Sequence, residues 1–112
     1  MKQIYFYKTS SGKEVITDFI DNLDEISKGR VRNGVRLLGN HGLDLMKNRS
    51  IKKISQKPDI FESRIIGKKQ VRLLFATYDK NTYLVVHVFI KKTQQTPKQD
   101  IRLAQKRVKE YI

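Results

Sequence analysis

The stretch QVRLLFATYDKNTYLVVHVFI, residues 70–90, decides the fold. It contains two segments, residues 70–78 and 82–90, that are rich in the β-branched and aromatic side chains typical of strands. Residues 79–81, Asp-Lys-Asn, have the composition of a tight turn. The two segments are therefore predicted to pair as an antiparallel hairpin.

The turn also predicts which side chains face each other. If Lys80 and Asn81 form a two-residue turn, Arg72 lies opposite Phe89 and Leu74 lies opposite His87. Side chains alternate between the two faces of a strand, so one face is predicted to be the apolar core. Its members are Val71, Leu73, Phe75, Leu84, Val86, Val88 and Ile90. The other face is mixed, and its cations gather at one end.

A third strand is predicted over residues 60–66, before a loop at residues 67–69. A three-residue loop places Arg64 opposite Arg72, with Glu62 on the same face. A two-residue loop would instead turn Arg64 into the core, where an unpaired charge is unfavourable. The hydrophobic pattern thus favours the three-residue loop and an antiparallel meander.

The sequence before the meander predicts a short strand over residues 4–7 and two helices. Ser11 and Glu14 have capping-box spacing, so the first helix is expected to begin there. The second helix is expected over about residues 27–38, and residues 39–42 (Gly-Asn-His-Gly) provide its stop. The stretch 43–57 is ambiguous and is interpreted as a loop with a short strand at 51–54.

The sequence after the meander predicts a last helix, which runs to about Tyr111. Thr96 is the expected N-cap, with Pro97 at the first helical position and Gln99 as the capping-box partner. The fold class is α+β, a single domain over residues 1–112. Two N-terminal helices are predicted to pack on one face of an antiparallel sheet, with a C-terminal helix.

The amino-acid composition limits the classes of partner and of site that the chain can have. The 112 residues carry a formal net charge of +13, a charge that favours a polyanionic partner, most commonly nucleic acid. An anionic membrane or an acidic protein would satisfy the same electrostatics. The absence of cysteine excludes disulfides, a thiol nucleophile and a thiolate metal site. No signal peptide or membrane-spanning run is recognisable, so a cytoplasmic protein with no membrane partner is expected.

Three cations, Arg64, Arg72 and Lys91, are predicted to converge on the mixed face, with Phe89 and His87 beside them. Arginine matches a phosphate with two parallel hydrogen bonds, and lysine adds a mobile point charge. Such a set stabilises the charge that develops in a phosphoryl transition state. An aromatic ring among the cations offers a surface on which an unpaired base stacks.

Three segments carry a resemblance to a known family: IFESRI (60–65), VRLLF (71–75) and FIKKTQQTP (89–97). They resemble the HigB-like branch of the RelE/ParE toxin superfamily, phage-derived relatives included. The block FxKKTxxTP followed by a basic terminal helix is the most specific part. The N-terminal half matches only in the order of its elements.

This resemblance implies a RelE-like (microbial RNase-like) fold and a type II toxin that cleaves messenger RNA at the ribosome. The implied reaction is attack of the 2′-OH on the adjacent phosphate, without metal or cofactor, and the implied partner is a HigA-like helix-turn-helix antitoxin. Arg64 and Arg72 match the basic strand residues of the family, and Lys91 or Lys92 matches its basic position after the last strand. Alternation along the strand favours Lys91 as the third catalytic residue.

The proton-transfer roles stay open, because no Tyr or His occurs between Lys92 and Tyr111, where several relatives carry one. Glu62, His87 or a lysine with a lowered pKa is a candidate. The alternatives are that Glu62 only forms an ion pair that orients Arg64, and that His87 and Phe89 only pack. With two histidines and no cysteine, no transition-metal site is expected.

The remaining cations are expected to dock RNA or ribosome phosphates: Lys92, Lys98, Arg102, Lys106 and Arg107. A solvated helix face is the alternative for most of them. Two other functions are consistent with the same residues. One is a non-catalytic basic nucleic-acid-binding protein, and the other is an interaction module for an acidic partner.

Overall fold

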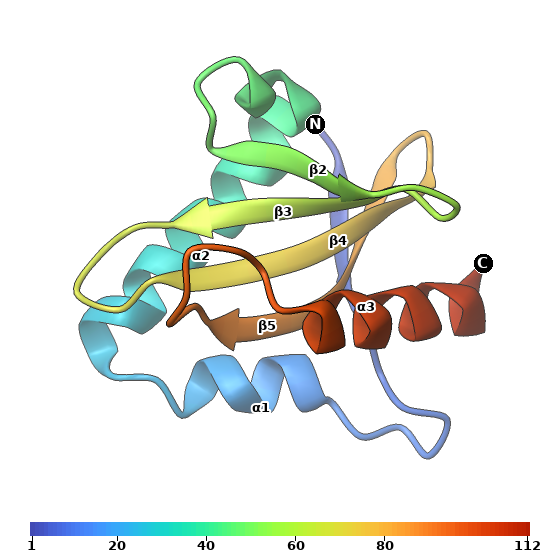
Figure 1. Cartoon of the computed structure of the whole chain (residues 1–112), viewed down its shortest axis with the longest axis horizontal. Coiled ribbons are helices and arrows are strands. Elements are labelled where there is room, and N and C mark those ends of the chain that lie inside the picture. Colours follow the sequence, from blue (N-terminus) through green and yellow to red (C-terminus); the bar gives the residue numbers. More distant parts are fainter.

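The chain forms a five-stranded sheet with strand order β1-β5-β4-β3-β2, as seen in a computed structural model that describes residues 1–112 (Figure 1). The strands are β1 (Gln3–Phe6), β2 (Ile51–Ser55), β3 (Ile60–Ile65), β4 (Val71–Asp79) and β5 (Thr82–Ile90). The helices are α1 (Val15–Asp21), α2 (Glu25–His41), the short 3-10 helix η1 (Gly42–Met46) and α3 (Lys98–Tyr111).

The predicted meander is confirmed. β3, β4 and β5 pair antiparallel, and Asp79 lies opposite Thr82 across the two-residue turn. Arg72 lies between Arg64 on β3 and Phe89 on β5, as the loop lengths predicted. Two register shifts lie between the β4–β5 turn and Arg72, one between Thr77 and Asp79 and one between Leu74 and Phe75. They cancel, so the register at the basic end of the sheet equals the predicted one.

The predicted faces are wrong toward the turn. A β-bulge shifts the register after Leu74, so that Phe75 lies opposite Val85 and Ala76 opposite Leu84. An extra residue in one strand reverses which face its later side chains occupy. Val85 therefore shares a face with Phe75, and Leu84 does not. The alternation of the sequence gave no sign of this bulge, because the residues on both sides of it are apolar.

The sheet is mixed and not antiparallel as predicted, because β1 pairs parallel to β5. Ile4 lies opposite Tyr83, and Phe6 lies opposite Val85. β1 thus forms one edge of the sheet and β2 the other. The direction of a strand is decided by the path of the whole chain, so the local pattern of residues 4–7 could not predict it.

The helices cover both faces of the sheet. The sequence predicted one face covered by the two N-terminal helices, and this arrangement is wrong in detail. α2 packs against β3 and β1 on one face, α1 lies along β5, and α3 packs against β5 and β4 on the opposite face (Figure 1). Under α3, Leu74 and Ala76 are fully or almost fully buried. The face predicted to be mixed, with its cations at one end, therefore also contains a second core under α3. We call these two surfaces the α2 face and the α3 face.

Two helix starts differ from the prediction. α1 begins at Val15, and its N-cap residue Glu14 makes no side-chain capping bond. Ser11 bonds the hydroxyl of Thr9 in a turn that includes Gly12 at φ +87°, so Ser11 and Glu14 do not form a capping box. α2 begins earlier than expected, because the side chain of Asp24 accepts a hydrogen bond from the Ser27 amide at 3.0 Å.

The other predicted ends are close to those observed. α2 continues to His41 and stops at Gly42, whose φ of +59° suits glycine. A Cβ there would also come within 2.8 Å of the Tyr83 hydroxyl oxygen. None of the helices has the length and apolar character needed to cross a membrane.

The core under α2 provides a stability prediction. Leu38 of α2 is fully buried, so Leu38→Ala should lower the free energy of unfolding by about 2–5 kcal/mol. Ile26 on the same helix is 69% exposed, and Ile26→Ala should change it by no more than about 0.5 kcal/mol. Urea denaturation of both variants checks this. Equal losses would contradict the described packing of α2.

Candidate phosphate-binding site

The candidate site lies on the α3 face, where side chains of four strands form two adjacent rows. In one row Lys52 of β2, Glu62 of β3, Leu74 of β4 and His87 of β5 lie opposite one another. In the next row Arg64, Arg72 and Phe89 do so. The three-strand register thus brings Arg64, Arg72 and Glu62 together as the sequence predicted.

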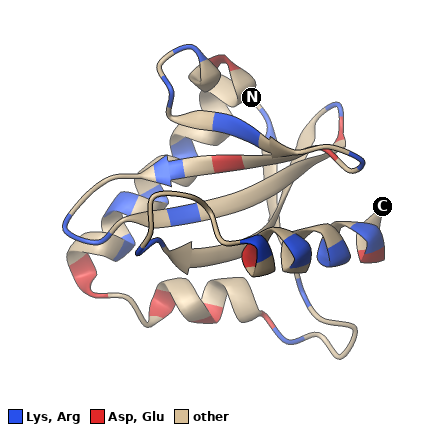
Figure 2. Cartoon of the chain, in the orientation of Figure 1, with Lys and Arg blue, Asp and Glu red and all other residues tan.

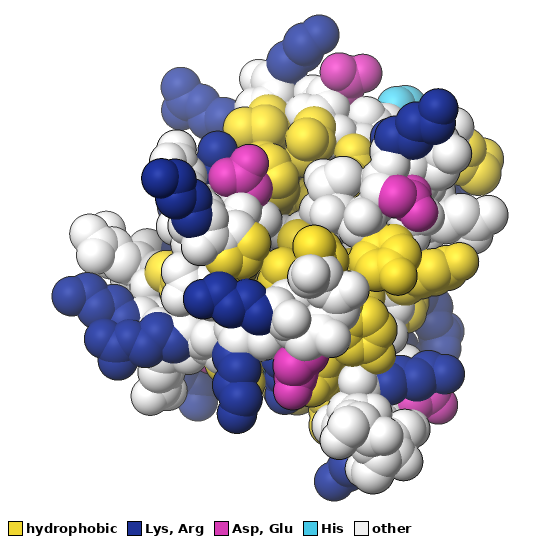
Figure 3. All heavy atoms as spheres, turned by 90° about the vertical axis from the view of Figure 1, so that its right-hand side faces the viewer, with side chains coloured by type: hydrophobic (Ala, Val, Ile, Leu, Met, Phe, Trp, Pro, Cys, Tyr) yellow, Lys and Arg dark blue, Asp and Glu magenta, His cyan; other side chains and the backbone are white.

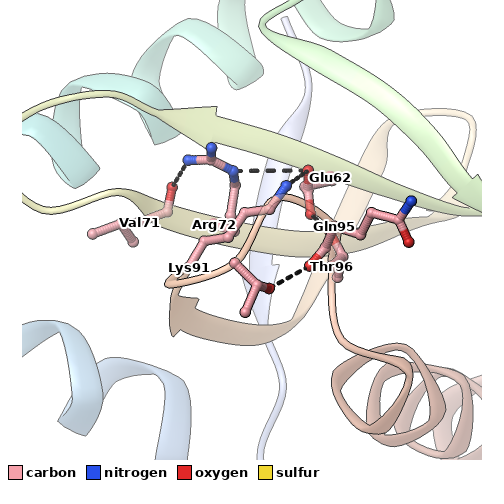
Figure 4. A network of polar contacts seen from close by, with 7 residues as sticks. Glu62, Val71, Arg72, Lys91, Gln95 and Thr96 are labelled. Carbon is pink, nitrogen blue, oxygen red and sulfur yellow. Dashed lines mark hydrogen bonds and ion pairs between the residues drawn. The ribbon is translucent and has the colours of Figure 1, made fainter.

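Glu62 lies at the centre of the site and is completely buried (Figure 4). Its Oε1 lies 3.8 Å from Nε of Arg72 and 4.0 Å from Nζ of Lys91. Its Oε2 accepts a hydrogen bond from the hydroxyl of Thr96. A buried carboxylate needs such partners, because burying an isolated charge costs several kcal/mol or more. Glu62 therefore ties β3 to β4 and to the connection before α3.

The pairing within this cluster is incomplete. Glu62 Oε1 and Arg72 Nε are buried and make no hydrogen bond. Their separation of 3.8 Å leaves a Coulombic attraction without the directional bond that a closer approach would give. Nη1 of Arg72 donates to the carbonyl oxygen of Val71 at 3.1 Å. The site thus retains hydrogen-bonding capacity that its own residues do not satisfy.

Burial and crowding shift the pKa values of both buried cations. Burial lowers the pKa of Arg72, the charge of Glu62 raises it, and the charge of Arg64 lowers it further. Burial is the largest cause of the lowered pKa of Lys91. The charge of Glu62, the second cause, raises this pKa. Lys52, Arg72 and Arg64 lower it further. Lys91 therefore loses its proton more readily than an ordinary lysine.

Two cations of the site are accessible and two are not. Arg64 and Lys52 are exposed, whereas Arg72 is buried and the Lys91 side chain is 9% exposed. Lys52 was not singled out from the sequence, because its segment was ambiguous there. Its place opposite Glu62 shows that it belongs to the cluster. Arg72 and Lys91 thus lie within 4.0 Å of Glu62, and Arg64 and Lys52 add their charges on the same face of the sheet. The excess positive charge favours an anionic ligand.

The segment from Lys91 to Pro97 covers the buried part of the site (Figure 4). Thr96 was predicted to cap α3, but its hydroxyl donates to Glu62 instead. The N-cap residue of α3 is Pro97, without a side-chain capping bond. A buried carboxylate competes for this hydroxyl better than a helix end that solvent can hydrate. Lys92 lies in the same segment and is exposed.

His87 and Phe89 lie beside the cluster and contact each other. Their rings stack with centroids 5.4 Å apart and an interplanar angle of 18°. Phe89 is 9% exposed, which favours packing over the predicted role as a platform for a base. Nε2 of His87 lies 2.7 Å from Oδ1 of Asp100 in the first turn of α3. This contact and that of Thr96 with Glu62 hold both ends of the Thr96–Asp100 segment to the sheet.

The cations of α3 divide into two groups. Lys98, Arg102 and Lys106 are exposed, and Figure 2 shows basic residues at successive turns of α3. Arg107 turns toward the sheet, where its Nη1 donates to the carbonyl oxygen of Val86 at 2.9 Å. Its guanidinium also lies 4.8 Å from the ring centroid of Tyr7. Arg107 therefore takes part in the packing of α3. No three side chains of the metal-binding types gather anywhere in the structure.

His87 provides a test of the site's electrostatics. Burial lowers its pKa from 6.5, Asp100 raises it, and Arg107 lowers it further. The unfolded chain therefore binds this proton more readily, and the wild type should lose stability as the pH falls below 6.5. The variant His87→Gln should lack this loss of stability as the pH falls below 6.5. NMR titration of the imidazole checks the midpoint, and a value above 6.5 would contradict the burial argument.

One comparison with known proteins identifies a family. The model of one protein family, described as phage derived protein Gp49-like, matches residues 18–109, a range that includes every residue of the site. No curated protein matches the chain. The matched family is associated with RelE-type toxins that are endoribonucleases, and a toxin of this kind has an antitoxin partner. The chain belongs to the Gp49-like family of phage-derived proteins, within the RelE/ParE-like toxin superfamily of toxin–antitoxin systems.

Proposed function

We propose that this chain is a HigB-like toxin that cleaves messenger RNA at the ribosome and is neutralised by a HigA-like antitoxin. The observation that carries the proposal is the excess of cations around Glu62: Arg64, Arg72, Lys91 and Lys52. These side chains come from three strands and from the residue that follows β5, and they lie on one face of the sheet. Their charge suits a phosphate, and their setting in a toxin family suits RNA.

The proposed reaction uses the RNA as its own nucleophile. The 2′-oxygen attacks the adjacent phosphorus and loses its proton, while the bond from phosphorus to the 5′-oxygen breaks and that oxygen gains a proton. The products are a 2′,3′-cyclic phosphate and a 5′-hydroxyl. The exposed Arg64 and Lys52 would contact an incoming phosphate. The buried Arg72 and Lys91 would attract it electrostatically without contact.

Proton transfer is assigned to the groups nearest this cluster. Lys91 is supported by its lowered pKa, which places more of it in the neutral form that accepts a proton. Glu62 is the alternative base, and it becomes accessible only when the segment over it moves, since Thr96 and its own burial shield it. His87 is held by Asp100, which supports a positioning role for it.

A non-catalytic nucleic-acid-binding protein is the second candidate function. The observation that favours it is the burial of Arg72, Lys91 and Glu62, which leaves only Arg64 and Lys52 open to a ligand. Such a protein would bind RNA with the same salt dependence and leave it intact. Analysis of the RNA ends separates the two functions.

Arg64→Ala is the variant that tests cleavage most directly, because Arg64 is exposed and its loss leaves no buried charge unpaired. Expression of the wild type in bacteria should arrest growth and produce new 5′-hydroxyl ends inside translated messages. Arg64→Ala should reduce cleavage by purified chain on programmed ribosomes by about a hundredfold. Sequencing of the 5′ ends measures both effects.

Lys13→Ala is the matched control, since it removes an exposed cation far from the site along the chain and should cleave like the wild type. Arg72→Ala is a poorer test on its own. It would leave the buried Glu62 with less compensation, at a cost of about 3–5 kcal/mol. Its circular dichroism and thermal unfolding must be followed in parallel. Intact messages from a well-expressed, folded wild type would refute the nuclease proposal.

The exposed cations of α3 give a separate prediction about binding. Replacing Lys98, Arg102 and Lys106 together by alanine should weaken RNA binding uniformly across sequences. The slope of log K against log salt should fall by about 2–3, because each phosphate contact adds about 0.7–0.9. Arg107→Ala should instead lower stability by about 1.5–3 kcal/mol through its lost bond to Val86. Filter binding over a salt series and urea denaturation check the two effects, and an unchanged slope would exclude α3 from the RNA surface.

A further inference from the structure

A groove runs between α2 and the end of β3, outside the buried cluster. Its first part has a volume of about 440 Å³ and lies between Ile26 and Arg30 of α2 and Ile66 after β3. A second hollow of about 400 Å³ shares Leu37 and Arg64 with the first, so the two form one continuous feature. We call this feature the α2–β3 groove. Arg64 lies at the junction of its two parts.

The groove exposes apolar side chains to water, and this exposure is unfavourable. Ile26 is 69% exposed and Ile66 is 62% exposed, and they lie on its two walls. Gly29 faces the groove without a side chain, and a Cβ there would meet nothing within 4 Å. An open hollow with exposed aliphatic walls is typical of a surface that a protein partner covers.

The charge of the first hollow specifies the kind of partner. Arg30 and Arg64 line it, and no acidic residue does. Arg30 is held in place by a bond from its Nη1 to the carbonyl oxygen of Ile66 at 3.3 Å. Aliphatic walls offer no surface on which nucleic-acid bases stack, so they favour a protein. Asp44 lines the second hollow, so the acidic side chains of an occupant would lie in the first. The complementary occupant is a protein segment that carries both apolar and acidic side chains.

We propose that the antitoxin of this chain inserts such a segment into the α2–β3 groove and pairs one of its carboxylates with Arg64. Because Arg64 is also the exposed arginine of the phosphate-binding cluster, this contact would remove it from the RNA. The antitoxin would then neutralise the toxin through Arg64 alone, without any contact to the buried Arg72 or Lys91. This inference rests on the proposed function, since it assigns a role to Arg64 that matters only if Arg64 handles phosphate.

Another exposed apolar surface competes for the same role. At the end of the sheet that carries the β4–β5 turn, hydrophobic side chains gather over the molecular surface (Figure 3). Tyr5 and Tyr78 are exposed, and their ring centroids lie 6.3 Å apart. Tyr78 lies near the end of β4, far along that strand from the Arg72 that pairs with Arg64. A partner bound at this end could not reach Arg64 by the same contact.

The test begins with the antitoxin gene, recovered from genomic fragments of the source organism by its ability to restore growth to cells that express the wild-type chain. The dissociation constant of the purified antitoxin is then measured by calorimetry for the wild type and the variants. Gly29→Gln fills the groove from a position with free space around it, and Ile26→Glu places a negative charge on its wall. Each should raise the dissociation constant by at least about thirtyfold and leave growth arrest intact in the absence of antitoxin.

The matched controls are Gly29→Ala, which adds only a methyl group to the groove, and Tyr78→Glu at the other surface. Both should bind the antitoxin within about threefold of the wild type. The proposal is overturned if the groove variants bind normally, if Tyr78→Glu is the variant that weakens binding, or if no neutralising gene is recovered. A wild type that does not arrest growth would instead refute the proposed function, so the two failures are distinguishable.

Discussion

The burial of β4 on both faces is the constraint on which the rest of the structure depends. Leu73 and Phe75 are buried on the α2 face, and Leu74 and Ala76 on the α3 face. A strand that is apolar on both sides needs a cover on each, and no single layer of helices can supply it. α2 therefore covers one face and α3 the other, with β4 in the middle of the sheet (Figure 1).

The candidate site is a consequence of that second cover. When α3 and the segment before it pack on β4 and β5, Glu62 is enclosed together with Arg72. A carboxylate in such a place must be compensated, which explains why Lys91 and the hydroxyl of Thr96 also turn toward it. The contacts that compensate the charge of Glu62 are therefore the same contacts that hold the segment before α3 against the sheet.

Arg64 has a different position from the other cations. It stands opposite Arg72 in the sheet, yet it is exposed and lines the α2–β3 groove. A single side chain thus connects the phosphate-binding cluster on one face with a hollow beside the helix of the other face. This position makes Arg64 available both to a phosphate and to a protein partner, and it allows one ligand to exclude the other.

Much of the site could be predicted because it depends on local register. The predicted turn lengths place Arg64, Arg72 and Phe89 opposite one another, although for Phe89 the agreement depends on two register shifts between β4 and β5 that cancel. Strand alternation places Glu62 on the same face. Lys52 could not be found in this way, because β2 lies in a stretch without clear alternation. The role of Thr96 was equally hidden, because its local sequence matches a helix cap and its actual partner lies 34 residues away.

The sequence by itself determined the elements, the antiparallel meander and the meeting of the arginines, because turn chemistry and side-chain alternation act over a few residues. Only the tertiary structure decided the parallel direction of β1, the bulge after Leu74 and the side on which α3 packs. It also decided that Arg72 and Lys91 are buried whereas Arg64 and Lys52 are exposed. These features depend on contacts between segments far apart in the chain, and such contacts leave no periodic pattern in the sequence.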